Sequence, residues 1–230
     1  MIDLVEFNGG QSDEFHPERA LVTWLSRLSV DVTSPFSPIG PRKSFFTFEK
    51  TRLKYWDDAA KKWVLDPGET DPSSSRYIPH GQIVYMPNGG QDVPYVYFDS
   101  RVFGRLETAS TLLSWSPPSG TAGSAVPYAQ DLNTDKKLNS TEWTSDGNTN
   151  GVWDNGETIT DSNNNKLLDL VGDVWANADT FQIISAGQDG KFGENRVRLY
   201  PTGAGYGPEN TDFDNVTNFS DQSSLEASLP

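Results

Sequence analysis

The sequence predicts an α+β fold, in which an N-terminal helix packs on a small antiparallel sheet and a stack of loops is inserted before the last strand. Apolar residues at three- and four-residue spacing predict the helix, and short runs of aromatic and β-branched residues predict the strands. A repeat rich in Asp and Asn predicts the inserted loops. We therefore divide the chain into 1–125 (helix plus sheet), 126–175 (loop insertion) and 176–230 (last strands and C-terminal tail of the same head).

Residues 13–30 carry the helical pattern. The apolar positions that share one helix face are Leu21, Trp24, Leu25 and Leu28. Pro17 suits the first turn, and Arg27 suits the last turn because of the helix dipole. Prolines between positions 35 and 41 end the pattern.

Strands are expected where aromatic and β-branched residues gather. Residues 44–55 and 61–65 are expected to pair across a turn at 57–60. Further strands are expected at 82–86, 95–99, 181–186 and 196–200. The last thirty residues are expected to form an extended tail, packed on the domain or loose.

Composition excludes several classes of function. A formal charge of −14, from 18 basic and 32 acidic residues, argues against a nucleic-acid partner. The chain has no cysteine and two histidines, which excludes disulfides, thiolate metal sites, a Cys nucleophile and a multi-histidine centre. Its apolar stretches are too short to cross a bilayer, and residues 1–8 lack the features of a secretory leader.

The strongest chemical signal is a 15-residue repeat that fills residues 131–175. We call its units loop one (131–145), loop two (146–160) and loop three (161–175), and residues 131–173 the loop array. Each loop begins with Asp, has Asn at the third position, Asp or Asn at the fifth, and Asn or Asp at the ninth. Loops one and two have Glu at the twelfth position.

This spacing is that of an EF-hand calcium loop, in which the seventh residue donates its backbone carbonyl and the twelfth binds through both carboxylate oxygens. The expected ligands of loop two are Asp146, Asn148, Asn150, the carbonyl of Val152, Asp154 and Glu157, with Gly151 supplying the left-handed turn. Those of loop one are Asp131, Asn133, Asp135, the carbonyl of Lys137, Asn139 and Glu142, with Lys136 in place of the turn glycine. Loop three offers Asp161, Asn163, Asn165, the carbonyl of Leu167 and Asp169. Because Gly172 stands at its twelfth position, loop three is either degenerate or completed by Asp173.

The alternative interpretation is an ordinary solvated loop, since Asp, Asn and Gly are common turn residues. Nine carboxylates against three lysines give the array a net charge of −6, which favours a bound cation. Three residues between loops are too few for paired helix–loop–helix hands, so stacked loops forming a structural staple are expected. Their apolar spine is expected to comprise Trp143, Trp153, Ile159, Leu167, Leu168 and Trp175.

Two later stretches, FQIISAGQDGKFG (181–193) and DFDNVTNFS (212–220), resemble the C-terminal end of type II secretion pseudopilins and related pilin-like proteins. The closing NFSDQSSLEASLP is similar to pilin-like proteins of planctomycete-type bacteria. The resemblance implies a pilin-like head and a calcium loop that pins the tail, with Asp189, Asp212 and Asp214 as ligands. An ordinary tight turn is the alternative at Asp189. Family members begin with a basic leader and a long apolar helix, which are absent here, so we expect a trimmed or processed form or a different mode of assembly.

These observations predict a non-enzymatic, calcium-stabilised pilin-like subunit of an extracellular filament or secretion pseudopilus. It is expected to be extracellular, at the cell surface or periplasmic in a bacterium, and to assemble with itself or with other pilin-like subunits. The alternative is a calcium-dependent adhesin or a carbohydrate- or protein-binding module that uses some of the seven Trp and eight Tyr residues. An enzyme such as a two-acid glycosidase is a third hypothesis, but no nucleophile elbow, phosphate loop or H-E-x-x-H motif is present.

Overall fold

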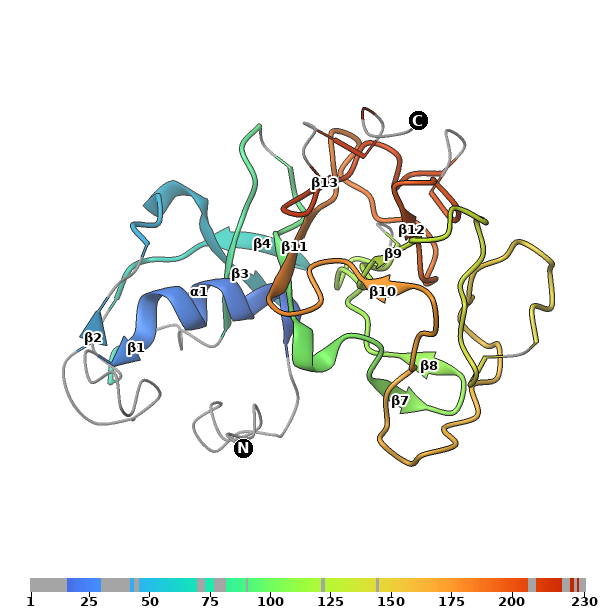
Figure 1. The fold of residues 1–230 in the computed structure, drawn as a ribbon. Coiled ribbons are helices and arrows are strands. Elements are labelled where there is room, and N and C mark those ends of the chain that lie inside the picture. The colour runs from blue at the N-terminus through green and yellow to red at the C-terminus, as the bar shows by residue number, and fades with distance from the viewer. Residues whose placement is uncertain are drawn as a thin grey trace. The chain divides into compact units, whose positions relative to one another are not determined.

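The computed structural model describes residues 16–29, 42–43, 46–69, 73–76, 82–89, 91–120, 123–143, 145–206, 210–220, 224–225 and 227. The chain divides into an N-terminal unit, residues 1–97, and a C-terminal unit, residues 98–230 (Figure 1). The loop array lies within the C-terminal unit. The expected boundaries at 125 and 175 stay a prediction.

The N-terminal unit contains helix α1 and most of the early strands. Its elements are α1 (Pro17–Arg27), β1 (Leu28–Ser29), β2 (Arg42–Lys43), the 3-10 helix η2 (Lys50–Arg52), β3 (Leu53–Asp57), β4 (Lys62–Leu65) and β5 (Ile83–Tyr85). Pro17 opens α1 and Glu18 lies in its first turn, as helix polarity favours. The β1 and β2 strands form one antiparallel pair, and β4, β3 and β5 form a sheet in that order.

The hairpin between β3 and β4 confirms the expected pairing of 61–65 with the preceding strand. The side chain of Asp57 accepts hydrogen bonds from the backbone N–H groups of Ala59 (2.9 Å) and Ala60 (3.0 Å). Lys61 then takes a φ of 51°, which lets the chain reverse. Trp56 and Trp63 face each other across the hairpin with ring centroids 5.2 Å apart.

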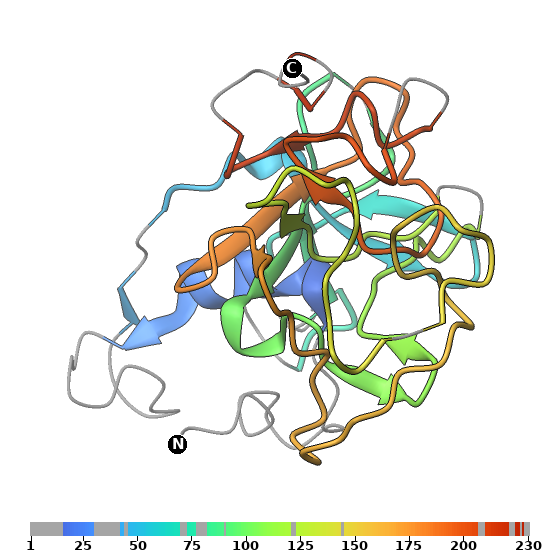
Figure 2. The same cartoon turned by 45° about the vertical axis from the view of Figure 1, so that its right-hand side comes forward.

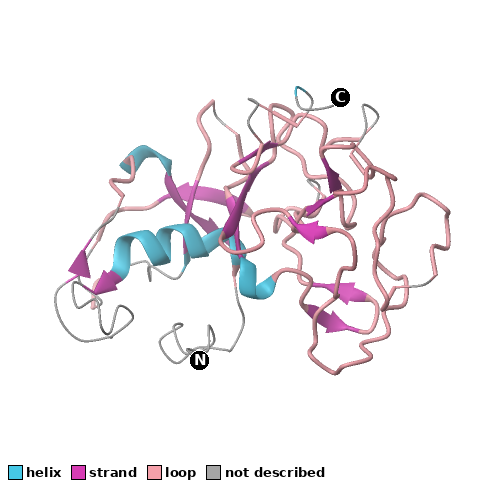
Figure 3. Ribbon diagram, in the orientation of Figure 1, coloured by secondary structure: helices cyan, strands magenta, loops and turns pink. Residues whose placement is uncertain are grey.

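The C-terminal unit is built from short strands joined by irregular chain (Figure 3). Strand β6 (Val96–Asp99) contains the boundary between the two units, and the 3-10 helix η4 (Ser100–Val102) follows it. The other elements are β7 (Leu106–Thr108), β8 (Thr111–Leu112), β9 (Ala129–Gln130), β10 (Val174–Trp175), β11 (Phe181–Ser185), β12 (Leu199–Tyr200) and β13 (Val216–Thr217). Their sheets have the orders β7-β8, β10-β9-β12 and β13-β11-β6; β10 is antiparallel and β12 parallel to β9.

The loop array supplies much of the core of the C-terminal unit. Its buried apolar side chains are Leu138, Trp143, Val152, Trp153, Ile159 and Leu168, and they pack with Leu112, Val126, Ala129, Val197 and Leu199 from the flanking segments. Leu167 and Trp175, also expected in the apolar spine, are only partly buried. The expected thin spine is therefore part of a larger core. Burying these large side chains stabilises the array against the entropy of ordering its loops.

The expected fold class, an N-terminal helix packed on an antiparallel sheet, is wrong. Within the described residues the strands fall into five small sheets, and the one α-helix has 11 residues. The physical reason lies in the chain's 20 glycines and 15 prolines, which interrupt the backbone ladders that a continuous sheet requires. Side-chain oxygens of Asp, Asn, Ser and Thr satisfy many of the remaining backbone N–H groups instead.

Individual elements were predicted better than their assembly. The helix expected at 13–30 is α1 over Pro17–Arg27 only: Leu28 and Ser29 form β1 instead, and residues 13–15 and 30 lie outside the described part of the chain. The strands expected at 82–86, 95–99, 181–186 and 196–200 correspond to β5, β6, β11 and β12, with β12 limited to its last two residues. The run at 44–55 is broken by η2, so only its end joins β3. Residues 1–8, His80 and several residues after Asn218 lie outside the description.

Candidate calcium-loop array

The three loops of the array share one backbone conformation. In each of them the fourth and sixth residues have the positive φ of the left-handed region, which residues other than glycine rarely adopt. They are Thr134 (60°) and Lys136 (62°) in loop one, Thr149 (61°) and Gly151 (82°) in loop two, and Asn164 (59°) and Lys166 (61°) in loop three. The repeat in sequence is thus a repeat in structure. Between β9 and β10 the array, yellow to orange in Figures 1 and 2, is drawn without helix or strand.

The aspartate at the first position holds each loop in this conformation. Its carboxylate accepts a hydrogen bond from the backbone N–H of the sixth residue. These bonds join Lys136 to Asp131 (2.9 Å), Gly151 to Asp146 (2.8 Å) and Lys166 to Asp161 (2.9 Å). In loops two and three the other carboxylate oxygen also accepts the N–H of the fifth residue.

The third and fifth side chains repeat a second pattern of hydrogen bonds. The side-chain oxygen of each third residue accepts the N–H of the fifth, in Asn133 (3.0 Å), Asn148 (3.1 Å) and Asn163 (3.0 Å). The side-chain oxygen of each fifth residue accepts the N–H of the seventh, in Asp135 (2.8 Å), Asn150 (2.9 Å) and Asn165 (2.8 Å). These bonds hold the oxygen-bearing side chains of each loop against its own backbone.

The third, fifth and ninth side chains meet. In loop two, Asn148 and Asn150 both donate a side-chain N–H to Asp154 Oδ2, at 2.8 and 2.7 Å. Asn163 and Asn165 do the same to Asp169 Oδ2 in loop three, at 2.6 and 2.9 Å. Each of these asparagines thus uses both ends of its amide, because its oxygen accepts a backbone N–H of the loop while its N–H₂ group donates to the ninth residue. Carboxylate, amide and backbone oxygens are the donors that Ca²⁺ takes.

A further carboxylate closes loop two. Glu157, its twelfth residue, accepts the backbone N–H of the second residue, Gly147 (2.7 Å), and of the ninth, Asp154 (3.2 Å). The indole N–H of Trp143 also donates to Glu157 Oε2 (2.9 Å). We call a carboxylate that receives the second and ninth N–H groups the closing carboxylate of its loop.

Glu142 closes loop three rather than loop one. It accepts the N–H of Ser162 (3.1 Å), the second residue of loop three, and that of Asp169 (2.9 Å), the ninth. These two contacts match those of Glu157 in loop two. The glycine at the twelfth position of loop three is therefore compensated by a carboxylate from loop one.

Asp173 closes loop one rather than loop three. Its Oδ2 accepts the N–H of Asn139 (2.8 Å), the ninth residue of loop one. The backbone N–H of Leu132, the second residue, also favours the charged form of this carboxylate. With Glu142 and Asp173 exchanged in this way, each loop has its own closing carboxylate, and each combines three carboxylates with two asparagines.

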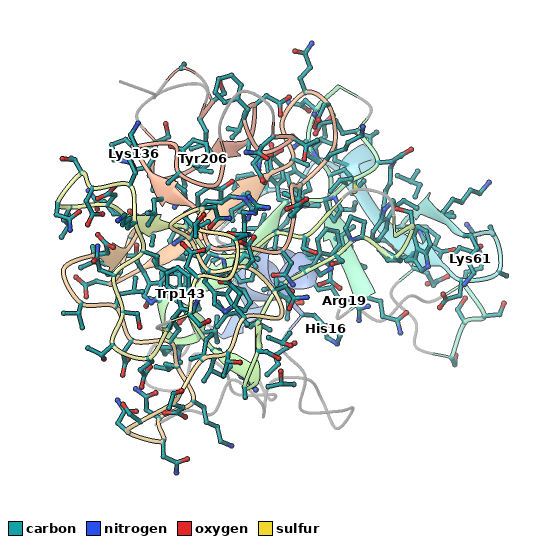
Figure 4. The ribbon with its side chains drawn as sticks, turned by 90° about the vertical axis from the view of Figure 1, so that its right-hand side faces the viewer. His16, Arg19, Lys61, Lys136, Trp143 and Tyr206 are labelled. Carbon is teal, nitrogen blue, oxygen red and sulfur yellow. The ribbon has the colours of Figure 1, made fainter. Side chains whose placement is uncertain are left out.

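Loops one and two have different charged neighbours. The guanidinium of Arg196 lies beside loop two, with Nε 3.0 Å from Asp154 Oδ1. In loop one, burial raises the pKa of Asp173 and the carboxylate of Asp131 raises it further, whereas hydrogen bonds from Asn139 lower it. The exposed Asp135 has a lowered pKa, chiefly because its carboxylate accepts the Lys137 N–H. Lys136 extends outward at the surface while Trp143 lies among the core side chains (Figure 4).

The residues expected from the pilin-like resemblance also come together. We call residues 187–193 with 212–218 the C-terminal junction. Asp214 Oδ2 accepts the N–H groups of Gln188 (2.5 Å) and Asp189 (2.9 Å), which ties the tail to the loop. Burial, together with the carboxylates of Asp214 and Asp212, raises the pKa of Asp189.

Asp212 has a different partner from the one expected. Its Oδ2 lies 2.6 Å from Nε of Arg198, and its Oδ1 accepts the Gly193 N–H (2.8 Å). Arg198 and Asp212 are each only 1% exposed. Their ion pair neutralises this carboxylate within the protein. Sequence reasoning missed Arg198, and the sequence around it carries no motif that pairs it with Asp212.

The described residues contain neither a ready-made metal cluster nor a membrane-spanning helix. No three Asp, Glu or His side chains gather there in a group that could hold a metal ion. No described helix combines the length and apolar character needed to span a bilayer. Comparison of the chain with protein-family models, with curated proteins and with solved structures found no match.

Proposed function

We propose that this protein is a non-enzymatic, calcium-stabilised structural subunit whose functional site is the loop array. The observation that carries the proposal is the repetition of one loop geometry three times, with oxygen-bearing side chains at matching positions. Glu142, Glu157 and Asp173 each accept the backbone N–H of the ninth residue of one loop, although they come from different places in the sequence. Ordinary solvated turns need no carboxylate at the same place in every repeat. Three loops that each bind an ion through the same set of ligands do need one.

Calcium is favoured over other cations by the chemistry of the donors. All of them are hard oxygens, and the chain has no cysteine to bind a softer metal. Flexible, mixed oxygen sets suit Ca²⁺ better than the smaller Mg²⁺, which requires a strict octahedron. A role outside the cytoplasm follows from this proposal, because weak structural calcium sites fill where the ion is at millimolar concentration.

The test is calcium binding measured by calorimetry on the full chain. Wild type is expected to bind at least one Ca²⁺, and the double variant Asp146→Ala/Glu157→Ala is expected to lose the loop-two site. The control, Asp58→Ala/Asp179→Ala, removes the same charge from exposed positions outside the array. Equal binding by wild type and the loop-two variant would rule out this ligand set, and no binding by wild type would refute the proposal.

Assembly into a filament, with itself or with other pilin-like subunits, is the second part of the proposal. Its support is that the two stretches that resemble pilin-like proteins are in contact. The Asp214 carboxylate binds the loop at 188–189, and Asn218 Oδ1 accepts the N–H of Ile183 in β11 at 2.8 Å. Negative-stain microscopy in calcium buffer is expected to show filaments that shorten or disappear with a chelator. Persistent monomers that bind glycans or proteins would favour the adhesin or binding-module alternative.

A further inference from the structure

Strand register explains why Asp131 and Asp173 meet. β9 and β10 are antiparallel, with Ala129 opposite Trp175 and Gln130 opposite Val174. The next opposed pair in this register is Asp131 and Asp173, where both strands open into the array. Directly opposed residues on an antiparallel pair have Cβ atoms about 5 Å apart, and like charges in that position destabilise the pair.

Both of these carboxylates are buried and incompletely bonded. Asp131 and Asp173 are each 3% exposed, and the Oδ1 atom of each is buried without a hydrogen-bond partner. The other oxygen of Asp131 accepts the hydroxyl of Thr202 (2.8 Å). Among the described residues, neither aspartate takes part in any ion pair. Two adjacent buried carboxylates with bare oxygens are strongly destabilising unless a cation lies between them.

We propose that one Ca²⁺ bridges Asp131 and Asp173, and that loops one and three form a reciprocally closed pair in which each is completed by a carboxylate from the other's segment. This inference rests on the proposed calcium function and specifies which segments of the chain complete each site. The bridging ion joins the two ends of the array, 42 positions apart in the chain, with Asp135 and the Lys137 carbonyl as further oxygen donors of loop one.

Reciprocal closure makes two sites depend on each other. When calcium orders loop one it fixes the 171–173 segment, which is continuous with loop three; the N–H of Val171 also donates to the Asn139 carbonyl (2.8 Å). Calcium in loop three correspondingly fixes Glu142 and the end of loop one. We expect each of these sites to raise the affinity of the other about 5-fold or more. Loop two, closed by its own Glu157, is expected to bind independently.

The test compares Asp173→Asn, Glu142→Gln and Glu157→Gln in the full chain, with Asp179→Asn as the exposed control. Calcium-dependent hydrogen exchange is followed in segments 133–138, 148–153 and 163–168. Asp173→Asn is expected to raise the calcium concentration needed to protect segment 133–138 from exchange at least about tenfold. Glu142→Gln is expected to have the same effect on segment 163–168. Glu157→Gln is expected to affect 148–153 alone. Loss of protection in 133–138 after Glu142→Gln, with 163–168 unchanged, would overturn reciprocal closure.

A second measurement separates a metal ligand from a structural hydrogen-bond acceptor. Without calcium, Asp173→Asn removes repulsion from Asp131 and is expected to melt at the same temperature as wild type or higher. With calcium it is expected to melt lower than wild type. An equal loss of stability with and without calcium would show that Asp173 only accepts hydrogen bonds, and would overturn the bridge. Wild type that binds no calcium would instead refute the proposed function itself.

Discussion

The loop array and the C-terminal junction are both rich in aspartate, but their carboxylates are balanced in different ways. In the junction, Asp212 is paired with the buried Arg198, and Asp214 binds two backbone N–H groups. In the array, the buried Asp131 and Asp173 face each other with unpartnered oxygens. The comparison teaches that aspartates with similar local sequence differ in what balances them: a buried arginine at Asp212, and no basic side chain among the described residues at Asp131 and Asp173.

The largest expected effect is at the junction and does not involve calcium. Replacing Arg198 by Met leaves Asp212 as a buried charge without its partner, which is expected to lower the free energy of unfolding by about 3–5 kcal/mol. Urea unfolding should give the same loss in calcium and in chelator. Arg101→Met, which removes a half-exposed guanidinium paired with Asp99, is the control, with an expected loss of about 0–1 kcal/mol. A loss for Arg198→Met that calcium reverses would mean that an ion also supports the junction.

Calcium removal is expected to act on the array and to spare the junction. At a hundredfold excess over Kd, one bound ion stabilises the folded state by about 2.7 kcal/mol, so chelation is expected to lower Tm by about 5–10 °C. Protease should then cut first within residues 131–173. Calorimetry and timed proteolysis with and without chelator measure both effects. First cuts within residues 210–220 would reverse the assignment of the calcium-dependent region.

Strain in the loops provides a smaller and sharper test. Lys136 and Lys166 occupy the left-handed position that Gly151 fills in loop two. Replacing either lysine by glycine is expected to raise the free energy of unfolding by about 1 kcal/mol, because the conformation carries no Cβ penalty for glycine. Gly151→Ala is expected to have the opposite effect, since its Cβ would lie 2.7 Å from the Lys136 carbonyl oxygen. Thermal melts at saturating calcium measure all three, and Lys137→Gly, at a position without positive φ, is the control.

The shared geometry of the three loops follows from residues that lie within twelve positions of one another, whereas their role as calcium ligands stays a prediction. The hydrogen bonds of the first, third and fifth positions are local, so spacing alone identifies them. The closing residues could not be assigned correctly, because Asp173 reaches loop one through the β9–β10 register and Glu142 reaches loop three across the array. The prediction of the fold class failed for a related reason. The strands are so short that pairing between distant segments decides which sheets they form, and no local sequence pattern indicates that pairing.

The smallest effect is expected at Asp189, and it asks whether the junction also holds calcium. Burial and two neighbouring carboxylates raise the pKa of Asp189 in the folded protein, so its charged form opposes folding. The native state therefore loses stability as pH rises through the ordinary Asp range up to this raised pKa, and its stability changes no further at higher pH.

In chelator, the Asp189→Asn variant is expected to lack this pH-dependent component and to be slightly more stable than wild type at pH 7. If no ion binds at the junction, the same small gain should appear in calcium. A gain in chelator that becomes a loss in calcium would identify Asp189 as a ligand and would make the junction a second calcium site. Urea unfolding from pH 4 to 7 under both conditions measures the difference, and Asp179→Asn provides a matched exposed control.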